Sequence, residues 1–189
     1  MSEKLFFPVL LGTNRNGRNS ENVARWVLEK IKERDDTKTQ LFDARDFKLP
    51  GSDYGQAIKD LFPEYKDAII RADGLVIVAP EYNHSFPGQL KSVLDLLLKE
   101  YIHKAVGLVG VSAGPWGGTR VIESLVPVVR ELGLVVTHAD LNFPMVQNTF
   151  NEDGTMKEEF AGSFNERVNK FLEELVWIAR ALKHGRENT

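Results

Sequence analysis

The strongest constraint on the fold is an alternation of short apolar runs with longer stretches of helical periodicity. The runs 5–11, 75–79 and 105–111 have strand length and almost no polar positions, as expected for strands covered on both faces. Apolar residues recur at helical spacing in the stretches between these runs. With two more strand candidates, at 39–42 and 134–137, strands and helices alternate five times. We therefore expect an α/β fold with a parallel sheet and helices on both of its faces.

Length and composition narrow the class of protein further. The 189 residues suit one domain, predicted over residues 1–183, followed by a frayed tail at 184–189. The net charge of −3 and the dispersed basic residues argue against a nucleic-acid surface. No apolar run reaches the length of a membrane span, and the first residues lack a signal peptide's apolar region, so we expect a cytoplasmic protein.

The chain has no cysteine, so a disulfide framework and a thiolate nucleophile are excluded. Its four histidines are scattered without paired spacing, which makes a metal site an unfavourable interpretation. Any redox chemistry would therefore have to come from an organic cofactor.

The first polar loop, residues 12–19, lies between an apolar run and a helix predicted to start at Ser20. A helix N-terminus carries unpaired N–H groups and partial positive charge, and Arg15 and Arg18 add guanidinium groups. The loop therefore predicts a phosphate site, with Ser20 as the N-cap. It lacks the lysine and hydroxyl of a nucleotide-hydrolase loop and a G-x-G-x-x-G fingerprint. The alternative is an ordinary turn with exposed arginines.

Two more polar loops, 80–88 and 112–118, also follow predicted strands. Because the carboxyl ends of parallel strands meet at one edge of a sheet, we expect all three loops to form one site. Prolines frame the second loop, and three glycines in the third indicate close backbone approach. The alternatives are that Tyr82 is a packing residue, that His84 is a surface histidine, and that the third loop is only a flexible turn.

The sequence also predicts the structure of three further segments. The helix predicted over 88–101 has more apolar surface than one buried stripe needs, which fits either a deeply buried helix or a subunit interface. Residues 140–156 are expected to be irregular. A long helix is predicted from Phe160 to about Leu182, with fraying from His184.

The loops together resemble those of the NAD(P)H-dependent FMN reductases of the flavodoxin-like superfamily. Residues 12–15 with Ser20 and Asn22 are similar to the family's G-S-x-R-x-x-S-x-N loop, with threonine for serine and two extra residues before Ser20. Residues 80–91 closely resemble the P-E-Y-N-x-S-x-P-G-x-L-K signature, and residues 112–118 resemble S-x-G-x-x-G-G.

This resemblance implies a flavodoxin-like three-layer αβα fold with a five-stranded parallel sheet. It implies that the FMN phosphate binds Thr13, Arg15, Ser20 and Asn22. The isoalloxazine ring would lie along Pro80, Glu81, Tyr82 and Asn83, with Ser112, Gly114, Gly117 and Gly118 at its other edge. It also implies a homodimer or homotetramer, with the helix 88–101 in the interface.

The implied activity is FMN-dependent oxidoreduction. NADPH or NADH would deliver a hydride to bound FMN, and a quinone, azo compound, free flavin or metal ion would then take the electrons at the same place, in a ping-pong cycle. No side chain is required as a catalytic acid or base. The competing hypotheses are a flavodoxin-type FMN electron carrier and a cofactor-free protein on the same fold.

Overall fold

The computed structural model describes residues 3–188, so residues 1–2 and 189 of the predicted domain and tail lie outside the described part. The described chain folds into six strands and five α-helices, joined by short 3₁₀ segments. In order they are β1 (Leu5–Leu11), α1 (Ser20–Lys32), β2 (Thr37–Asp43), α2 (Pro63–Arg71), β3 (Gly74–Pro80), α3 (Gly88–Leu94), β4 (Lys104–Val111), α4 (Thr119–Glu131), β5 (Leu134–Val136), β6 (Leu141–Phe143) and α5 (Glu158–Glu187).

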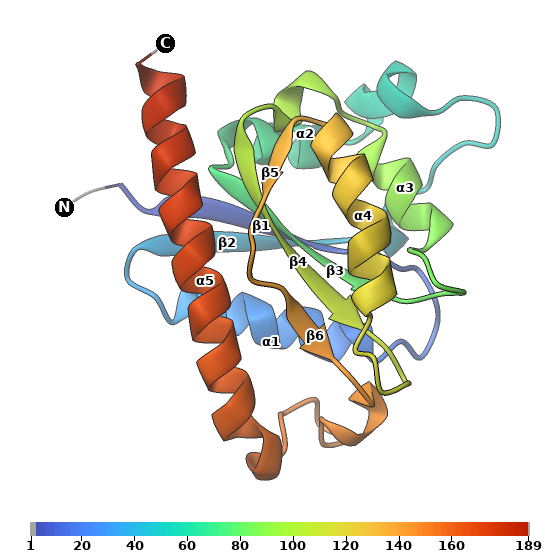
Figure 1. Cartoon of the computed structure of the whole chain (residues 1–189). Coiled ribbons are helices and arrows are strands. Elements are labelled where there is room, and N and C mark those ends of the chain that lie inside the picture. The colour runs from blue at the N-terminus through green and yellow to red at the C-terminus, as the bar shows by residue number, and fades with distance from the viewer. Residues whose placement is uncertain (1–2, 189) are drawn as a thin grey trace.

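The strands form one parallel sheet in the order β2-β1-β3-β4-β5 (Figure 1). This is the flavodoxin-like order. The chain adds β2 on one side of β1 and the later strands on the other side, so the switch point lies between β1 and β3. The sixth strand, β6, pairs with the last residues of β4, whereas β5 pairs with the first. The fifth position of the sheet is therefore occupied by two short strands. The expectation that 140–156 is irregular is wrong at 141–143, because three residues are too few to show a period.

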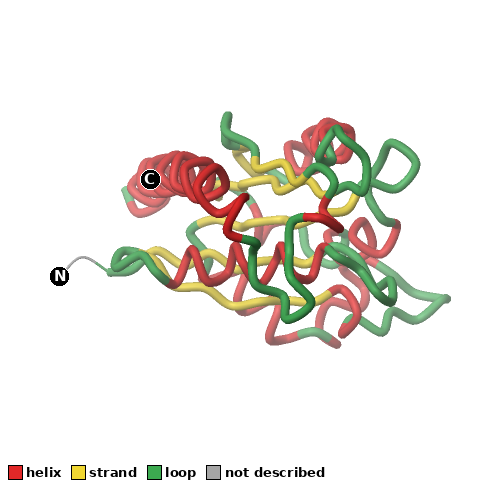
Figure 2. The backbone as a smooth tube through the Cα atoms, turned by 90° about the horizontal axis from the view of Figure 1, so that it is seen from below, coloured by secondary structure: helices red, strands yellow, loops and turns green. Residues whose placement is uncertain are grey.

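Alternate side chains of β1 point into two separate cores. Phe6 and Leu10 join the cluster beneath α2, α3 and α4, whereas Phe7, Val9 and Leu11 join the cluster beneath α1 and α5. The sheet is thus the middle layer of an αβα sandwich, as predicted. Figure 2 shows the strands running side by side with helices around them.

The helix predicted over 88–101 is shorter than expected, since α3 ends at Leu94. The chain then turns, and Leu94 and Leu97 are 0% and 1% exposed within the core of this single chain. Tyr101 is also buried, and its hydroxyl lies 2.8 Å from that of Tyr65. The excess of apolar residues is therefore explained by burial in the core, and Leu94 and Leu97 are not available to an interface.

The last helix, α5, extends to Glu187 and so includes residues 184–187, which the sequence predicted to fray. Arg186 connects this end to the sheet, donating to the carbonyl oxygen of His103 at 2.6 Å and to Asp73 at 3.2 Å. These long-range contacts stabilise a helix end that has no local signal. Within residues 3–188, no helix is both long enough and apolar enough to cross a membrane.

Candidate active site

A cavity of about 260 Å³ lies at the carboxyl edge of the sheet, where the strand order reverses between β1 and β3. The loops after β1, β3 and β4 form its walls, as predicted, and a segment after β6 adds one side chain. Its lining residues are Arg15, Gly17, Arg18, Asn19, Ser20, Pro80, Glu81, Tyr82, Val111, Ser112, Ala113 and Val146.

Half of the twelve predicted site residues line this cavity: Arg15, Ser20, Pro80, Glu81, Tyr82 and Ser112. The other six are not among the lining residues, namely Thr13, Asn22, Asn83, Gly114, Gly117 and Gly118. Their positions show which of them can meet a ligand and which support the loops from behind.

The hydroxyl of Ser20 is the clearest sign of a missing partner. In the described part of the chain, Ser20 Oγ is the one buried side-chain polar atom without a hydrogen bond. The N-cap position is held by Asn19, not by Ser20 as predicted, and no side chain of residues 3–188 caps this helix. The backbone N–H groups of Glu21 and Asn22 donate to the carbonyl oxygens of Arg18 and Asn19 at 3.3 and 3.2 Å, whereas the Ser20 hydroxyl at the start of α1 has no partner among the described residues. The partial positive charge of this helix end favours an anion nearby.

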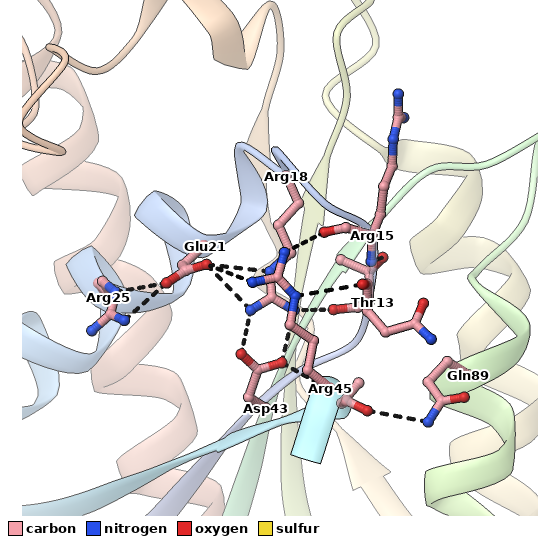
Figure 3. Close-up of polar contacts among 10 residues, drawn as sticks. Thr13, Arg15, Arg18, Glu21, Arg25, Asp43, Arg45 and Gln89 are labelled. Carbon is pink, nitrogen blue, oxygen red and sulfur yellow. Dashed lines mark hydrogen bonds and ion pairs between the residues drawn. The ribbon is translucent and has the colours of Figure 1, made fainter. Parts of the chain in front are cut away.

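The two loop arginines have opposite environments (Figure 3). Arg18 is buried, and its guanidinium forms a fork with Asp43 while also pairing with Glu21 at 3.2 Å. Arg15 is exposed on the cavity rim, and the structure records no carboxylate partner for it among residues 3–188. Its guanidinium carbon lies 6.0 Å from the centre of the Tyr82 ring. Arg15 is thus the free cation of the site.

The Arg18–Asp43 pair changes the acidity of both groups. Burial lowers the pKa of Arg18, but hydrogen bonds and charge from Asp43 and Glu21 outweigh burial and raise it. Burial raises the pKa of Asp43, but the Arg18 hydrogen bond and the backbone N–H of Arg45 outweigh burial and lower it. Both groups therefore remain charged across the physiological range.

Tyr82 joins the first loop to the second. Its hydroxyl lies 3.0 Å from Thr13 Oγ1, and its backbone pairs with Ser85 in both directions at 2.9 and 3.0 Å. Asn83 and His84 form the turn between them, with φ of 48° and 67°. Asn83 is therefore at an exposed tip, and Thr13 is buried beneath the cavity wall.

Glu81 is held by the start of α4. Its carboxylate accepts hydrogen bonds from Arg120 Nη1 at 3.0 Å and from the Arg120 backbone N–H at 3.3 Å. The Arg120 guanidinium lies 5.6 Å from the ring centre of Trp116, which is 63% exposed. Arg120 thus connects the exposed Trp116 to Glu81 of the cavity wall.

The third loop folds back on β4. Ser112 Oγ donates to the carbonyl oxygen of Gly114 at 2.9 Å. Gly118 has φ of 80°, and a Cβ there would lie 2.4 Å from the backbone nitrogen of Val111. A Cβ on Gly117 would lie 2.9 Å from Asn142 Cβ. These two glycines are needed for close packing of the loop, and they do not line the cavity.

Some features of the site have no local signal in the sequence. Val146 reaches the cavity wall because its backbone N–H donates to the carbonyl oxygen of Ser112 at 3.1 Å. Asn22 is turned away, and its Oδ1 faces Gly154. Asp43 and Arg45 support the first loop from the end of β2, and the charged residues at this strand end were the only sequence feature that indicated them.

No group of three His, Asp or Glu within 3–188 could hold a metal ion.

The sequence matches the model of the NADPH-dependent FMN reductase family over residues 8–148, which includes all three loops. An NAD(P)H-dependent FMN reductase of Nectria sp. is 28% identical over 198 residues, covering 95% of this chain and 98% of the relative. A quinone reductase of Escherichia coli K12 is 38% identical over 128 residues, covering 64% of this chain and 66% of the relative.

Among solved structures, the flavoenzyme NAD(P)H:(acceptor) oxidoreductase FerB from Paracoccus denitrificans has a similar fold. The TM-score is 0.72 at 21% sequence identity, and the match covers 90% of this chain and 97% of that protein. At this identity the likeness concerns the fold alone.

Proposed function

The chain belongs to the NADPH-dependent FMN reductase family, and from this premise we propose that its cavity holds FMN for the transfer of electrons from NAD(P)H to a second, small-molecule acceptor. The acceptor class is a quinone, an azo compound, free flavin or an oxidised metal ion. Two properties of the cavity support this proposal, one at each end.

The α1 end fits the phosphate group of FMN. Within residues 3–188, Ser20 supplies a buried hydroxyl without a partner and Arg15 a cation without a carboxylate, and the start of α1 adds the partial positive charge of a helix N-terminus. Arg18 lines the same wall, but its charge is already balanced by Asp43 and Glu21. We therefore assign the phosphate to Arg15, Ser20 and the helix start, with Thr13 behind them and Asn22 further along α1, its Oδ1 facing Gly154.

The opposite end fits a planar, partly polar ring. Pro80, Glu81 and Tyr82 form one wall, and Ser112 and Ala113 form the other. The hydrogen bonds of Tyr82 to Thr13 and of Glu81 to Arg120 hold the first wall in place. We propose that Asn83, Gly114, Gly117 and Gly118 shape these loops. A preorganised wall of this kind orients a ring without further rearrangement.

Bound FMN would supply the redox chemistry, accepting a hydride from NADPH or NADH and passing electrons to the second acceptor. The protein's task is to hold the ring and leave one face open to both substrates in turn. Trp116 and Arg120 lie beside the opening and can border the incoming substrate. No side chain is needed as a proton donor in this scheme, since the cofactor carries the reaction.

The observation that carries the proposal is that, within residues 3–188, Ser20 has a buried hydroxyl without a hydrogen-bond partner and lines the same cavity as Arg15, whose guanidinium has no carboxylate partner. The test is the absorbance spectrum of the FMN-loaded protein before and after anaerobic addition of NADPH. Bleaching of the flavin absorbance, followed by its recovery on adding a quinone, is the expected result. FMN that binds but stays oxidised with both NADPH and NADH would favour the electron carrier, and a protein that binds no FMN would refute the proposal.

We also propose that the chain works as a homodimer or homotetramer. Several apolar side chains stay exposed in the single chain, among them Tyr54 at 80%, Leu61 at 63% and Trp177 at 71%. Because Leu94 and Leu97 are buried, any interface that involves the 88–101 region must use its exposed residues, such as Leu98 at 41%. Light scattering gives the mass in solution, and a monomer would refute this proposal.

A cytoplasmic location is the last part of the proposal. The chain has no cysteine, so its fold does not depend on an oxidising compartment. Cell fractionation with an antibody against the chain tests the location directly.

A further inference from the structure

The first polar loop, residues 12–19, is supported by a charged cluster to which the proposed function assigns no role. We define the latch as Arg18, Glu21, Asp43 and Arg45 (Figure 3). Its members come from the first loop, the first turn of α1, the last residue of β2 and the 3₁₀ turn Ala44–Asp46. The latch lies against the cavity wall through Arg18, whereas Asp43 does not line the cavity.

Asp43 is the centre of this cluster. Its two carboxylate oxygens accept hydrogen bonds from the two terminal nitrogens of Arg18, at 2.7 Å for Oδ1. The same carboxylate accepts the backbone N–H of Arg45 at 2.9 Å, which fixes the turn that follows β2. A fork of this kind restricts the orientation of both side chains, because two parallel hydrogen bonds define a plane.

The two arginines of the latch hold the backbone of the first loop. Arg18 Nη1 donates to the carbonyl oxygen of Thr13. Arg45 Nη2 donates to the carbonyl oxygen of Arg15 at 2.5 Å, and its Nε to that of Asn14 at 3.4 Å. Three consecutive carbonyls are thus turned toward the end of β2. These contacts set the direction in which the Arg15 side chain leaves the backbone.

The latch also separates the charges of the loop. Arg18 is buried, so its charge requires compensation, which Asp43 and Glu21 supply. Arg15 has no such partner among the described residues and stays free for an anion. Without Asp43, Arg18 would be a buried cation with Glu21 as its remaining carboxylate, and it would have to leave its position or draw on another partner.

We propose that Asp43 is a positioning residue for phosphate recognition, acting through Arg18 and Arg45 on the loop 13–18 without touching the cofactor. The inference rests on the proposed FMN site. Its consequence is that the latch matters for a flavin that carries a phosphate and does not matter for one that lacks it.

The test compares binding of FMN and riboflavin to wild-type apoprotein and to Asp43→Asn, by fluorescence titration. The substitution keeps the shape of the side chain and removes its charge. We expect the Kd for FMN to rise at least tenfold and the Kd for riboflavin to change less than twofold. An unchanged Kd for FMN, or an equal loss for both flavins, would overturn the proposal.

Asp36→Asn is the matched control. Asp36 lies directly before β2, at the other end of the strand from Asp43, and it pairs with Arg34 at 3.0 Å and Arg180 at 2.7 Å. This variant removes the same charge from an arginine cluster far along the strand from the loop. We expect it to bind both flavins as the wild type does. An equal rise in the Kd for FMN in Asp36→Asn would show a general loss of stability and overturn the proposal.

A second variant keeps the proposal falsifiable if Asp43→Asn does not fold. The Arg45 side chain is 35% exposed, so Arg45→Ala removes its two contacts with the loop at little risk to the core. We expect a smaller loss, about threefold to tenfold, again confined to FMN. Wild-type protein that takes up neither flavin would refute the proposed function itself, whereas tight wild-type binding with unchanged variants would refute the latch alone.

Discussion

Replacing Ser20 with alanine should have opposite effects on the stability of the apoprotein and on its affinity for FMN. The hydroxyl of Ser20 is buried and has no hydrogen-bond partner in the described chain. A buried polar group without a partner costs about 1–3 kcal/mol, and alanine is also a slightly better helix former than serine. We therefore expect apo Ser20→Ala to be about 1 kcal/mol more stable than wild type, which corresponds to a Tm rise of roughly 2–4 °C for a chain of this size.

The same substitution should weaken FMN binding. A hydrogen bond from a neutral hydroxyl to a charged acceptor contributes about 1.5–3 kcal/mol, which is a rise in Kd of roughly 10- to 150-fold. Ligand binding to the native state stabilises it in proportion to the logarithm of the ratio of ligand concentration to Kd. At a fixed excess of FMN the order of the two Tm values should therefore reverse, with Ser20→Ala below wild type.

The assay is thermal unfolding of both proteins with and without FMN, together with an FMN titration. Ser92→Ala is the control, because Ser92 Oγ donates to the carbonyl oxygen of Gly88 at 3.1 Å and lies outside the cavity lining. We expect it to leave the Tm unchanged or slightly raised in both states, because alanine is the better helix former, without changing the Kd. An apo Ser20→Ala protein that is less stable than wild type, or an unchanged Kd for FMN, would refute the assignment of this hydroxyl to the phosphate.

Three further expectations concern charge and burial. Arg15→Ala should raise the Kd for FMN by a factor of about 10 or more. It should leave the apoprotein Tm unchanged, because Arg15 has no carboxylate partner within residues 3–188. An equal loss of riboflavin binding would contradict the assignment of Arg15 to the phosphate. Hydrogen bonds from Arg34 lower the pKa of Asp36; burial raises the pKa of Asp43, but Arg18 outweighs burial and lowers it. The stabilisation from these two carboxylates should therefore be fully present above the unfolded Asp pKa of about 3.9 and be lost as the pH falls through the lowered native values. Urea unfolding at several pH values should show a free energy of unfolding that depends less steeply on pH in Asp36→Asn and Asp43→Asn than in wild type. Leu94→Ala should lower the free energy of unfolding in urea by about 2–5 kcal/mol and leave the mass measured by light scattering unchanged, because Leu94 is buried in the core. Dissociation of an oligomer without loss of stability would instead place Leu94 in an interface.

The sequence predicted those parts of the fold that rest on local patterns. Apolar runs of strand length separated by amphipathic stretches define a parallel sheet with two helical layers, because each element carries its own periodicity. Parallel strands bring their carboxyl ends to one edge, so the convergence of the three loops also followed from the predicted parallel direction of the strands. Arg15, Ser20, Tyr82 and Ser112 could thus be placed at one site before any contact was known.

Where prediction failed, an element depended on a distant part of the chain. The last residues of α5 are held by Arg186 against His103 and Asp73, which no local signal shows. The apolar residues after α3 could lie in a core or an interface, and only their burial in this chain decided between the two. The edge strand β6 exists because the end of β4 offers it hydrogen bonds.

The loop 12–19 shows most clearly what the sequence determined and what the tertiary structure decided. The sequence by itself determined that a glycine-rich loop with two arginines stands between a buried strand and a helix, since that depends on neighbouring residues. The local pattern alone did not distinguish Arg15 from Arg18, because both are loop arginines with similar neighbours, and only the family resemblance pointed to Arg15. The tertiary structure separates them: Asp43 lies 25 positions along the chain from Arg18, and the pairing of β1 with β2 brings its carboxylate under the loop. One arginine is thereby neutralised and buried, and the other stays free, because the partner that decides a side chain's charge balance is set by strand pairing.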